Sequence, residues 1–367
     1  MKQRLFLLML CTMLFAPTQA QETLTFNASY VGDAVGNIDG GIKRGGAYLG
    51  MANITVDLKT DRWWRGGEFF VNGASIHGTS PSEKLVGDCQ VLVNIDGGNH
   101  TYMHELWYKQ TFGKVELTAG LQDLNANFAV TDNGSEYINS SFGIAGLLSS
   151  NVPAPVFPLT ALAFTAQWNI NDHATWLGSV FDGKPTDFDR NPYNLTWNLS
   201  KNDGVLLYTE LQLKDLLKAR SGTYRLGYYY HSKLMEEGET VFKDDYGFYL
   251  IADQDLWQSG ERRVSAFLQF ALSPNVNSLH NFYIGGGVNA YGIFGSRAND
   301  VAGIALASLG FHRGMHKHET AIEAFYRLQL TRNISLQPDI QYIINPSGSD
   351  KKLSNALAGI LRLGVEF

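Results

Sequence analysis

The sequence predicts an all-β fold, a transmembrane antiparallel β-barrel of about sixteen strands with one long loop folded into its lumen. Three observations support this class. Polar and apolar side chains alternate along many short segments, and the connections between these segments are by turns tight and longer. After the N-terminal stretch, the chain has no apolar run of roughly 18 residues, the length that a membrane-spanning helix needs. Barrel strands are short and only half apolar, so the last observation is compatible with a barrel.

The alternation is clearest in ISLQPDIQYII, residues 334–344. Neighbouring side chains of a strand point to opposite faces, so one face here is apolar and the other is polar. In a barrel the apolar face meets lipid, where an outward cation costs about 2–4 kcal/mol. Arg225, Arg327 and Arg362 accordingly fall on the inward faces of their segments. Pro338 cannot donate to a strand ladder, which predicts a bulge or a rim position there.

Sixteen segments between turn signals are expected to be strands. An even number is typical of bacterial outer-membrane barrels, as are tight turns at one rim and long loops at the other. Two connections on the short side, at residues 214–221 and 290–299, are longer than this rule predicts. The expected strands lie near residues 24–33, 43–58, 63–77, 100–112, 114–122, 160–170, 173–181, 203–213, 222–232, 244–257, 261–271, 279–289, 300–311, 316–331, 333–344 and 355–367.

Residues 1–20 have the pattern of a secretory signal peptide. Lys2 and Arg4 precede an apolar core at residues 5–16, and small residues surround a cleavage point after Ala20. Residues 21–367 would then form one barrel domain, exported by the Sec pathway to the outer membrane of a Gram-negative bacterium and surrounded by its lipid. The mature chain would keep only Cys89, which cannot form an internal disulfide.

Other classes find little support in the sequence. The net charge of −6 argues against nucleic-acid binding, which normally needs a basic stripe. The sequence contains no G-x-S-x-G elbow, P-loop or H-E-x-x-H motif, so we expect neither an enzyme nor a cofactor. His312, His316 and His318 fit an exposed hairpin tip, and a metal site is the less favoured interpretation of this cluster.

The segment after the fifth expected strand, residues 122–159, has neither a strand nor a helix period. Loops longer than about 12–15 residues are usually functional or disordered. Its many aromatic and aliphatic side chains favour a folded segment, which would narrow the channel if it turned inward. Its candidate lining residues are Asp123, Asn125, Asn127, Phe128 and Asn151.

Three stretches resemble the OprB-type carbohydrate-selective porins: NFAVTDNGSEYINSSFGIAGLLSSNVPAPVFPLTAL, ELWYKQTFGKVELTAGLQDLN and SLQPDIQYIINP. The resemblance extends from about Trp63 to Phe367, and it implies a sixteen-stranded outer-membrane barrel that passes monosaccharides through a constriction with charged side chains. GDCQVLVNIDGGN, at residues 87–99, departs from the family pattern, which more often has a small residue and serine before the Asn-Ile-Asp motif. The region before Trp63 matches only weakly.

A sugar offers hydroxyls around its rim and a flatter C–H face, so its binding needs donors, acceptors and an aromatic platform. By alternation Glu105, Trp107 and Lys109 share the face that we take as luminal. Either Arg65 or Glu68 would join them, because the two have opposite parity unless a bulge intervenes at Gly66 and Gly67. The other candidate inward charges are Arg225, Glu323, Arg327, Asp339 and Arg362. For each of these residues the alternative is a solvated wall position or a bracing ion pair.

The sequence therefore favours a passive channel for carbohydrates such as glucose. Two alternatives stay open: a general or anion-selective porin without sugar specificity, and a secreted soluble β-rich sugar-binding protein. The sequence leaves undecided whether the protein is a monomer or a homo-oligomer.

Overall fold

The computed structural model describes residues 23–367, apart from 198, 218–219, 233–235, 238–239, 242–243, 277, 293–294, 296, 315 and 350. The predicted signal peptide lies outside the described residues. The strands of the barrel are β1 (Leu24–Gly41), β2 (Gly45–Lys59), β3 (Gly67–Gly78), β4 (His100–Phe112), β5 (Val115–Gln122), β6 (Ala161–Asn171), β7 (Ala174–Asp182), β8 (Val205–Lys214), β9 (Gly222–His231), β12 (Asp245–Ser259), β13 (Arg262–Leu272), β14 (His280–Tyr291), β15 (Val301–Phe311), β16 (His318–Gln329), β17 (Ile334–Ile344) and β18 (Ser354–Glu366).

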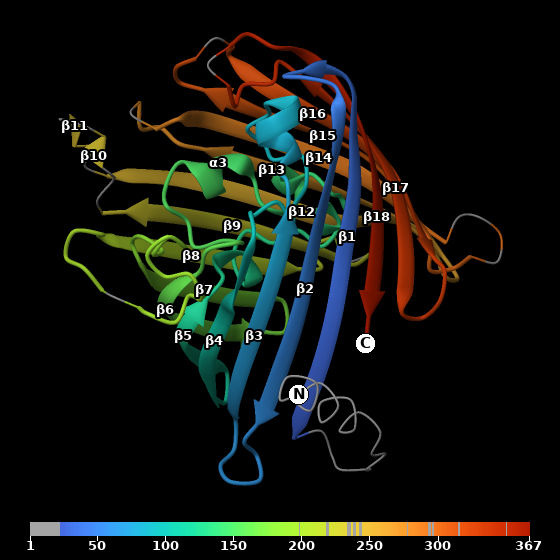
Figure 1. The fold of residues 1–367 in the computed structure, drawn as a ribbon. Helices are drawn as coiled ribbons and strands as arrows, with labels where there is room; N and C mark the ends of the chain where they lie inside the picture. Colours follow the sequence, from blue (N-terminus) through green and yellow to red (C-terminus); the bar gives the residue numbers. More distant parts are fainter. Residues whose placement is uncertain are drawn as a thin grey trace, which may run out of the picture.

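These strands form one closed antiparallel barrel (Figure 1). Each strand pairs with the next along the chain, except that β9 pairs with β12 because β10 (Glu236–Glu237) and β11 (Thr240–Val241) form a separate small hairpin. The first and last strands close the ring, and Phe367 exchanges backbone hydrogen bonds with Ala28. Closure leaves no edge strand with unpaired backbone groups, which is what allows a sheet to span lipid. The sixteen-stranded prediction is confirmed for the described residues.

The predicted strand boundaries hold to within a few residues, with two informative exceptions. The first strand continues to Gly41, eight positions beyond the prediction. The third begins at Gly67, because the Thr60 N–H donates to the Gly67 carbonyl and the intervening residues form a turn.

The expected bulge or rim position at Pro338 is wrong. Pro338 lies within β17, pairs with Leu361 of β18, and causes no register shift against β16.

Alternation assigns the two faces as predicted. Along the middle of β17, Gln337, Asp339 and Gln341 are buried, whereas Ile340 and Tyr342 are exposed. The exposed residues of the other strands are also mostly apolar, so the outer wall suits lipid and the polar side chains point inward. None of the helices in the described part of the chain is long and apolar enough to cross a membrane.

The main apolar core of this barrel lies inside it. Residues 123–160, which we call the constriction loop, fold into the lumen and contain η3 (Leu124–Ala126), η4 (Gly134–Glu136), α2 (Ser140–Gly143) and α3 (Gly146–Ser150). Figure 1 shows α3 within the ring of strands. The inward fold is confirmed, although the sequence showed no helix period for these short helices. Residues 79–99, the second inner loop, also turn inward through the π-helix η2 (Ser82–Val86), and this loop was not predicted.

Candidate functional site

The constriction loop covers one side of the lumen. Its buried apolar side chains, including Phe128, Phe142 and Leu147, pack on inward aromatics of the wall such as Tyr208 and Tyr283. Full burial of one such side chain contributes about 1.5–3 kcal/mol. Gly303 of β15 leaves the room that the loop needs, because a Cβ there would lie 2.7 Å from the Tyr137 hydroxyl. The free passage is therefore confined to the lumen that the loop leaves uncovered.

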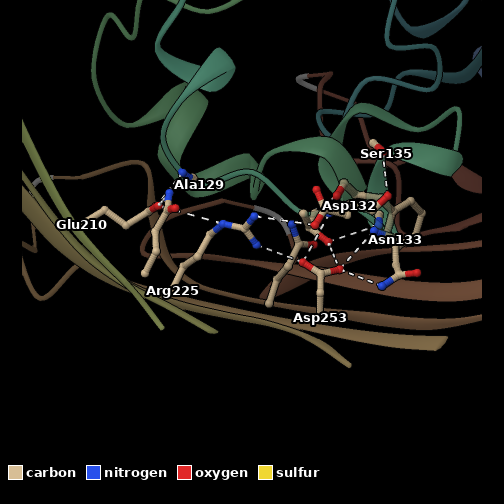
Figure 2. Close-up of polar contacts among 12 residues, drawn as sticks. Ala129, Asp132, Asn133, Ser135, Glu210, Arg225 and Asp253 are labelled. Atoms are coloured by element: carbon tan, nitrogen blue, oxygen red, sulfur yellow. Dashed lines mark hydrogen bonds and ion pairs between the residues drawn. The ribbon is translucent and has the colours of Figure 1, made fainter. Parts of the chain in front are cut away.

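Buried carboxylates of the wall hold the backbone of the constriction loop. Glu210 of β8 accepts the Ala129 N–H at 2.8 Å, and Asp253 of β12 accepts the Asn133 N–H at 3.0 Å (Figure 2). Further along the loop, Glu323 of β16 accepts the N–H groups of Ile138 and Asn139 at 2.6 and 2.9 Å. Hydrogen bonds to a charged acceptor contribute about 1.5–3 kcal/mol each. Together these three carboxylates fix the path of the loop across the lumen.

Arg225 of β9 sits among these anchors rather than at the water-filled surface. Its guanidinium lies 3.1 Å from Asp253, 4.0 Å from Glu210 and 3.8 Å from Asp132 of the loop, as Figure 2 shows. The residue is 7% exposed. A buried cation with such partners neutralises carboxylates that would otherwise repel one another. Arg225 is inward as expected, but the contacts correspond to the bracing alternative.

Glu319, at the start of β16, plays the same part for the second inner loop. Its side chain accepts N–H groups of Cys89, Gln90 and Ser347 at 2.7 to 3.1 Å. Asp88 lies next to this carboxylate, and burial together with the Glu319 charge raises the pKa of Asp88 to about 7. The second inner loop is thus held by one carboxylate acceptor beside a second buried carboxyl.

The two inner loops also bind each other. The Asn94 N–H donates to the Ile138 carbonyl at 2.8 Å. Gln341 of β17 bridges the loops, since its amide donates to Leu92 and accepts from Asn139. The family departure at residues 87–99 therefore falls in a segment that shapes the constriction.

Most of the predicted lining residues of the constriction loop make hydrogen bonds that hold the loop in place, and one of them is exposed. Asp123 accepts the Phe157 N–H at 3.2 Å and lies 3.1 Å from the His104 ring, so it ties the two ends of the loop to β4. Asn151 exchanges two hydrogen bonds of 2.9 Å with the His280 backbone. Asn125 donates to the carbonyl of Phe128, whose side chain is fully buried. Asn127 alone in this set is exposed.

The wall opposite carries the ELWYK residues that were predicted to face the lumen. Glu68 of β3 and Lys109 of β4 form an ion pair of 2.7 Å, and both stay partly exposed. The Trp107 indole N–H donates to Glu105 at 3.2 Å, and the Lys109 ammonium lies 5.5 Å from the Trp107 ring centroid. Arg65 is exposed in the turn before β3, so of the two opposite-parity candidates Glu68 is the inward one.

The remaining predicted charges occupy distinct environments. Arg327 pairs with Glu136 of the constriction loop at 2.5 Å and keeps 30% of its side chain exposed. Burial raises the pKa of Glu136, against the opposing effect of Arg327. Arg362 binds Asp33 at 2.7 Å and Asn94 at 2.6 Å. Asp339 is 7% exposed beneath the inner loops.

A recess of about 920 Å³ opens beside Arg327. Its lining includes Arg263, Tyr291 and Arg332, and the Arg263 guanidinium stacks 4.1 Å from the Tyr291 ring centroid. Among the described residues, no three His, Cys, Asp or Glu side chains gather closely enough to hold a metal ion. The site is a lumen whose wall carries interleaved positive and negative side chains.

Sequence analysis missed several residues on which this site depends. Asp33, Glu210 and Asp253 lie at inward parity within predicted strands, so alternation could have placed them in the lumen. Phe70, which stacks on Trp107, has inward parity as well. No sequence signal indicated which inward carboxylates would be covered by a loop.

A closed sixteen-stranded barrel with an apolar outer wall and a lumen narrowed by an internal loop defines an outer-membrane porin. The family model described as "Carbohydrate-selective porin, OprB family" matches residues 43–367, and the chain belongs to this family. The prediction of an outer-membrane carbohydrate channel of a Gram-negative bacterium is therefore confirmed, and the soluble alternative is wrong. The family and the fold describe a transport channel.

Individual relatives agree with this assignment. Porin B of Pseudomonas aeruginosa is 22% identical over 93% of this chain and 87% of its own length. The high-pH structure of Pseudomonas putida OprB superposes with a TM-score of 0.85 at 19% identity, covering 94% of both chains. DcaP, an outer membrane channel of Acinetobacter baumannii, has a TM-score of 0.56 at 11% identity, over 96% of this chain and all of its own. The last two likenesses concern the fold alone.

Proposed function

We propose that the protein lets monosaccharides such as glucose diffuse passively through the outer membrane. The observation that carries the proposal is the lumen beside the constriction loop, where Glu68, Lys109 and Trp107 present charges and an indole to one water-filled passage. Interleaved opposite charges hydrogen-bond neutral hydroxyls and disfavour bare ions. A channel must also release its cargo, so each sugar is bound weakly.

The remaining predicted residues take different parts in this proposal. Arg327, Arg362 and Asn127 meet the passing solute, while Arg225, Glu323 and Asp339 set the width of the passage by holding or supporting the inner loops. Asp123, Asn125, Phe128 and Asn151 keep the constriction loop closed, and Glu105 orients Trp107. Arg65 meets solutes only at the rim.

Liposome swelling across a graded set of solutes tests the proposal. Monosaccharides are expected to enter faster than unrelated neutral solutes of the same size, without any energy source. Swelling rates that depend on solute size alone would contradict sugar selectivity.

A general or anion-selective porin is the second candidate, because three arginines, Arg263, Arg327 and Arg332, line the recess beside the loop. Planar-bilayer recordings distinguish the two candidates. A sugar channel loses ion current when glucose occupies it, whereas an anion-selective porin shows a reversal potential set by anions and no block by glucose.

We infer from the N-terminal pattern that residues 1–20 are a Sec signal peptide, so that the mature barrel begins near Gln21. The mass of the chain purified from outer membranes tests this inference. The outward apolar wall is expected to contact membrane lipid directly.

A further inference from the structure

Three rungs of paired side chains stand one above another on the inner wall of β3 and β4. Glu68 is in register with Lys109, Phe70 with Trp107, and Asn72 with Glu105. Successive inward residues of a strand are about 7 Å apart, so each rung is close to its neighbours. The order is therefore a charged rung, an aromatic rung, and a rung of amide and carboxylate.

The aromatic rung is a face-to-face stack of two rings in an otherwise polar passage. The Phe70 and Trp107 ring centroids are 4.8 Å apart, with the ring planes inclined by 21°. Neither residue belongs to the core beneath the constriction loop, and both keep part of their surface exposed. The apolar core of the loop packs on other strands, and the loop meets β4 near its two ends, where the Asp123 N–H donates to Glu105 at 3.4 Å, so it leaves this pair facing the lumen.

The other two rungs hold the indole in place. Glu105 accepts the indole N–H, and Lys109 lies over the ring while its charge is paired with Glu68. The aromatic face carries partial negative charge, which attracts polarised C–H bonds. The groups on either side are hydrogen-bond donors and acceptors. A hexopyranose on the aromatic rung would place its C–H face on the side of Phe70 that Trp107 leaves free, and its rim hydroxyls toward the polar rungs.

We propose that this three-rung wall is a stereoselective hexopyranose subsite in which Phe70, together with Trp107, distinguishes sugars with a flat C–H face from acyclic polyols. The inference rests on the proposed sugar channel and adds the position and the basis of its selectivity. Acyclic polyols such as sorbitol carry the same kind of hydroxyls but have no fixed C–H face. They would gain the hydrogen bonds of the polar rungs without the stacking contact.

Phe70→Leu tests the subsite, because leucine keeps an apolar side chain of similar bulk and removes the aromatic face. The full mature chain is recorded in planar bilayers, and the glucose concentration that halves the ion current is measured with sorbitol in parallel. We expect the half-blocking glucose concentration to rise on the order of tenfold in Phe70→Leu, with little change for sorbitol. Phe70→Tyr, which keeps the ring, is expected to retain block by glucose.

Phe69→Leu is the matched control, because Phe69 is the neighbouring residue of the same type on the outer face and is 41% exposed there. It should leave the block unchanged. Equal half-blocking concentrations in the wild type, Phe70→Leu and Phe69→Leu would overturn the subsite while leaving a sugar-selective channel intact. A wild-type channel that glucose does not block, and whose swelling rates follow solute size alone, would overturn both proposals. If Phe70→Leu fails to fold, Trp107→Leu probes the same rung from β4.

Discussion

At the scale of the residue, inward charged side chains of this lumen are either buried under a loop or exposed to the passage. Arg225 is 7% exposed and has three carboxylate partners, whereas the Arg327 side chain is 30% exposed and pairs with Glu136. Both arginines avoid lipid for the same reason, and the parity of the strand cannot distinguish them. The difference arises because the constriction loop covers one and leaves the other beside the recess.

This contrast predicts different effects for two substitutions. Arg327→Glu should shift the reversal potential in a salt gradient toward cation selectivity, because the charge in contact with the passage is inverted. Arg225→Gln should shift it much less, but should lower the free energy of unfolding by about 3–5 kcal/mol, since Asp253 and Glu210 lose a buried partner. Urea titrations and bilayer recordings of both variants check these outcomes. Arg225→Gln with full stability and the larger selectivity shift would contradict the assigned roles.

At the scale of the element, each inner loop is a backbone segment held by carboxylates of the wall. A buried N–H needs an acceptor, and an irregular loop does not form the regular hydrogen-bond ladder of a strand or helix. Glu210, Asp253, Glu319 and Glu323 provide those acceptors from strands that are distant in sequence. The carboxylates of the wall therefore determine the path of both inner loops.

The second inner loop should make stability depend on pH through Asp88. Its pKa is raised from 3.8 to about 7, so the stability that the neutral carboxyl provides is fully present below about pH 4 and is lost as the pH rises toward 7. Asp88→Asn, which stays neutral, should be more stable than the wild type by about 1–4 kcal/mol at pH 8 and nearly equal to it at pH 4. Urea unfolding at the two pH values measures the difference. Asp172→Asn, in an exposed turn, is the control and should show no such trend.

At the scale of the whole molecule, the barrel differs from a globular protein because its outer surface is apolar and part of its interior is polar. Apolar side chains face outward along every strand, and the interior contains both a packed core against the loops and a polar passage. A sixteen-stranded ring is too wide for its own side chains to fill. The inner loops supply the missing interior, so closure of the wall and narrowing of the channel have separate structural causes.

The outward wall predicts a position-dependent cost for an added charge. Leu268 lies near the middle of β13 and is 48% exposed on the outer face. Leu268→Arg should make folding into lipid vesicles less favourable by about 2–4 kcal/mol, because the cation would face the hydrocarbon. Leu217→Arg, at a leucine that is 59% exposed in the turn between β8 and β9, should be nearly neutral. Equal effects of the two substitutions would contradict a lipid-facing position for Leu268.

Most of the wall was predictable from the sequence, because strand alternation is local. The parity of Gln337, Asp339 and Gln341 was enough to place them inside, and turn residues located the strand ends to within a few positions at most places. Pro338 was misjudged because its missing N–H is tolerated in the interior of β17, where the pairing with β16 skips a short stretch without a register shift. The inward turn of the constriction loop followed from its length and apolar content.

The sequence by itself thus determined a closed wall with lipid outside and polar side chains inside. Alternate side chains of each strand face lipid and water, so an apolar and a polar residue follow one another along the whole wall. Only the tertiary structure decided which inward side chains meet the passing solute. Glu323 and Glu68 have the same parity argument behind them, yet Glu323 is fully buried under a loop and Glu68 faces the passage. That distinction depends on contacts between segments more than a hundred residues apart, and no local pattern encodes it.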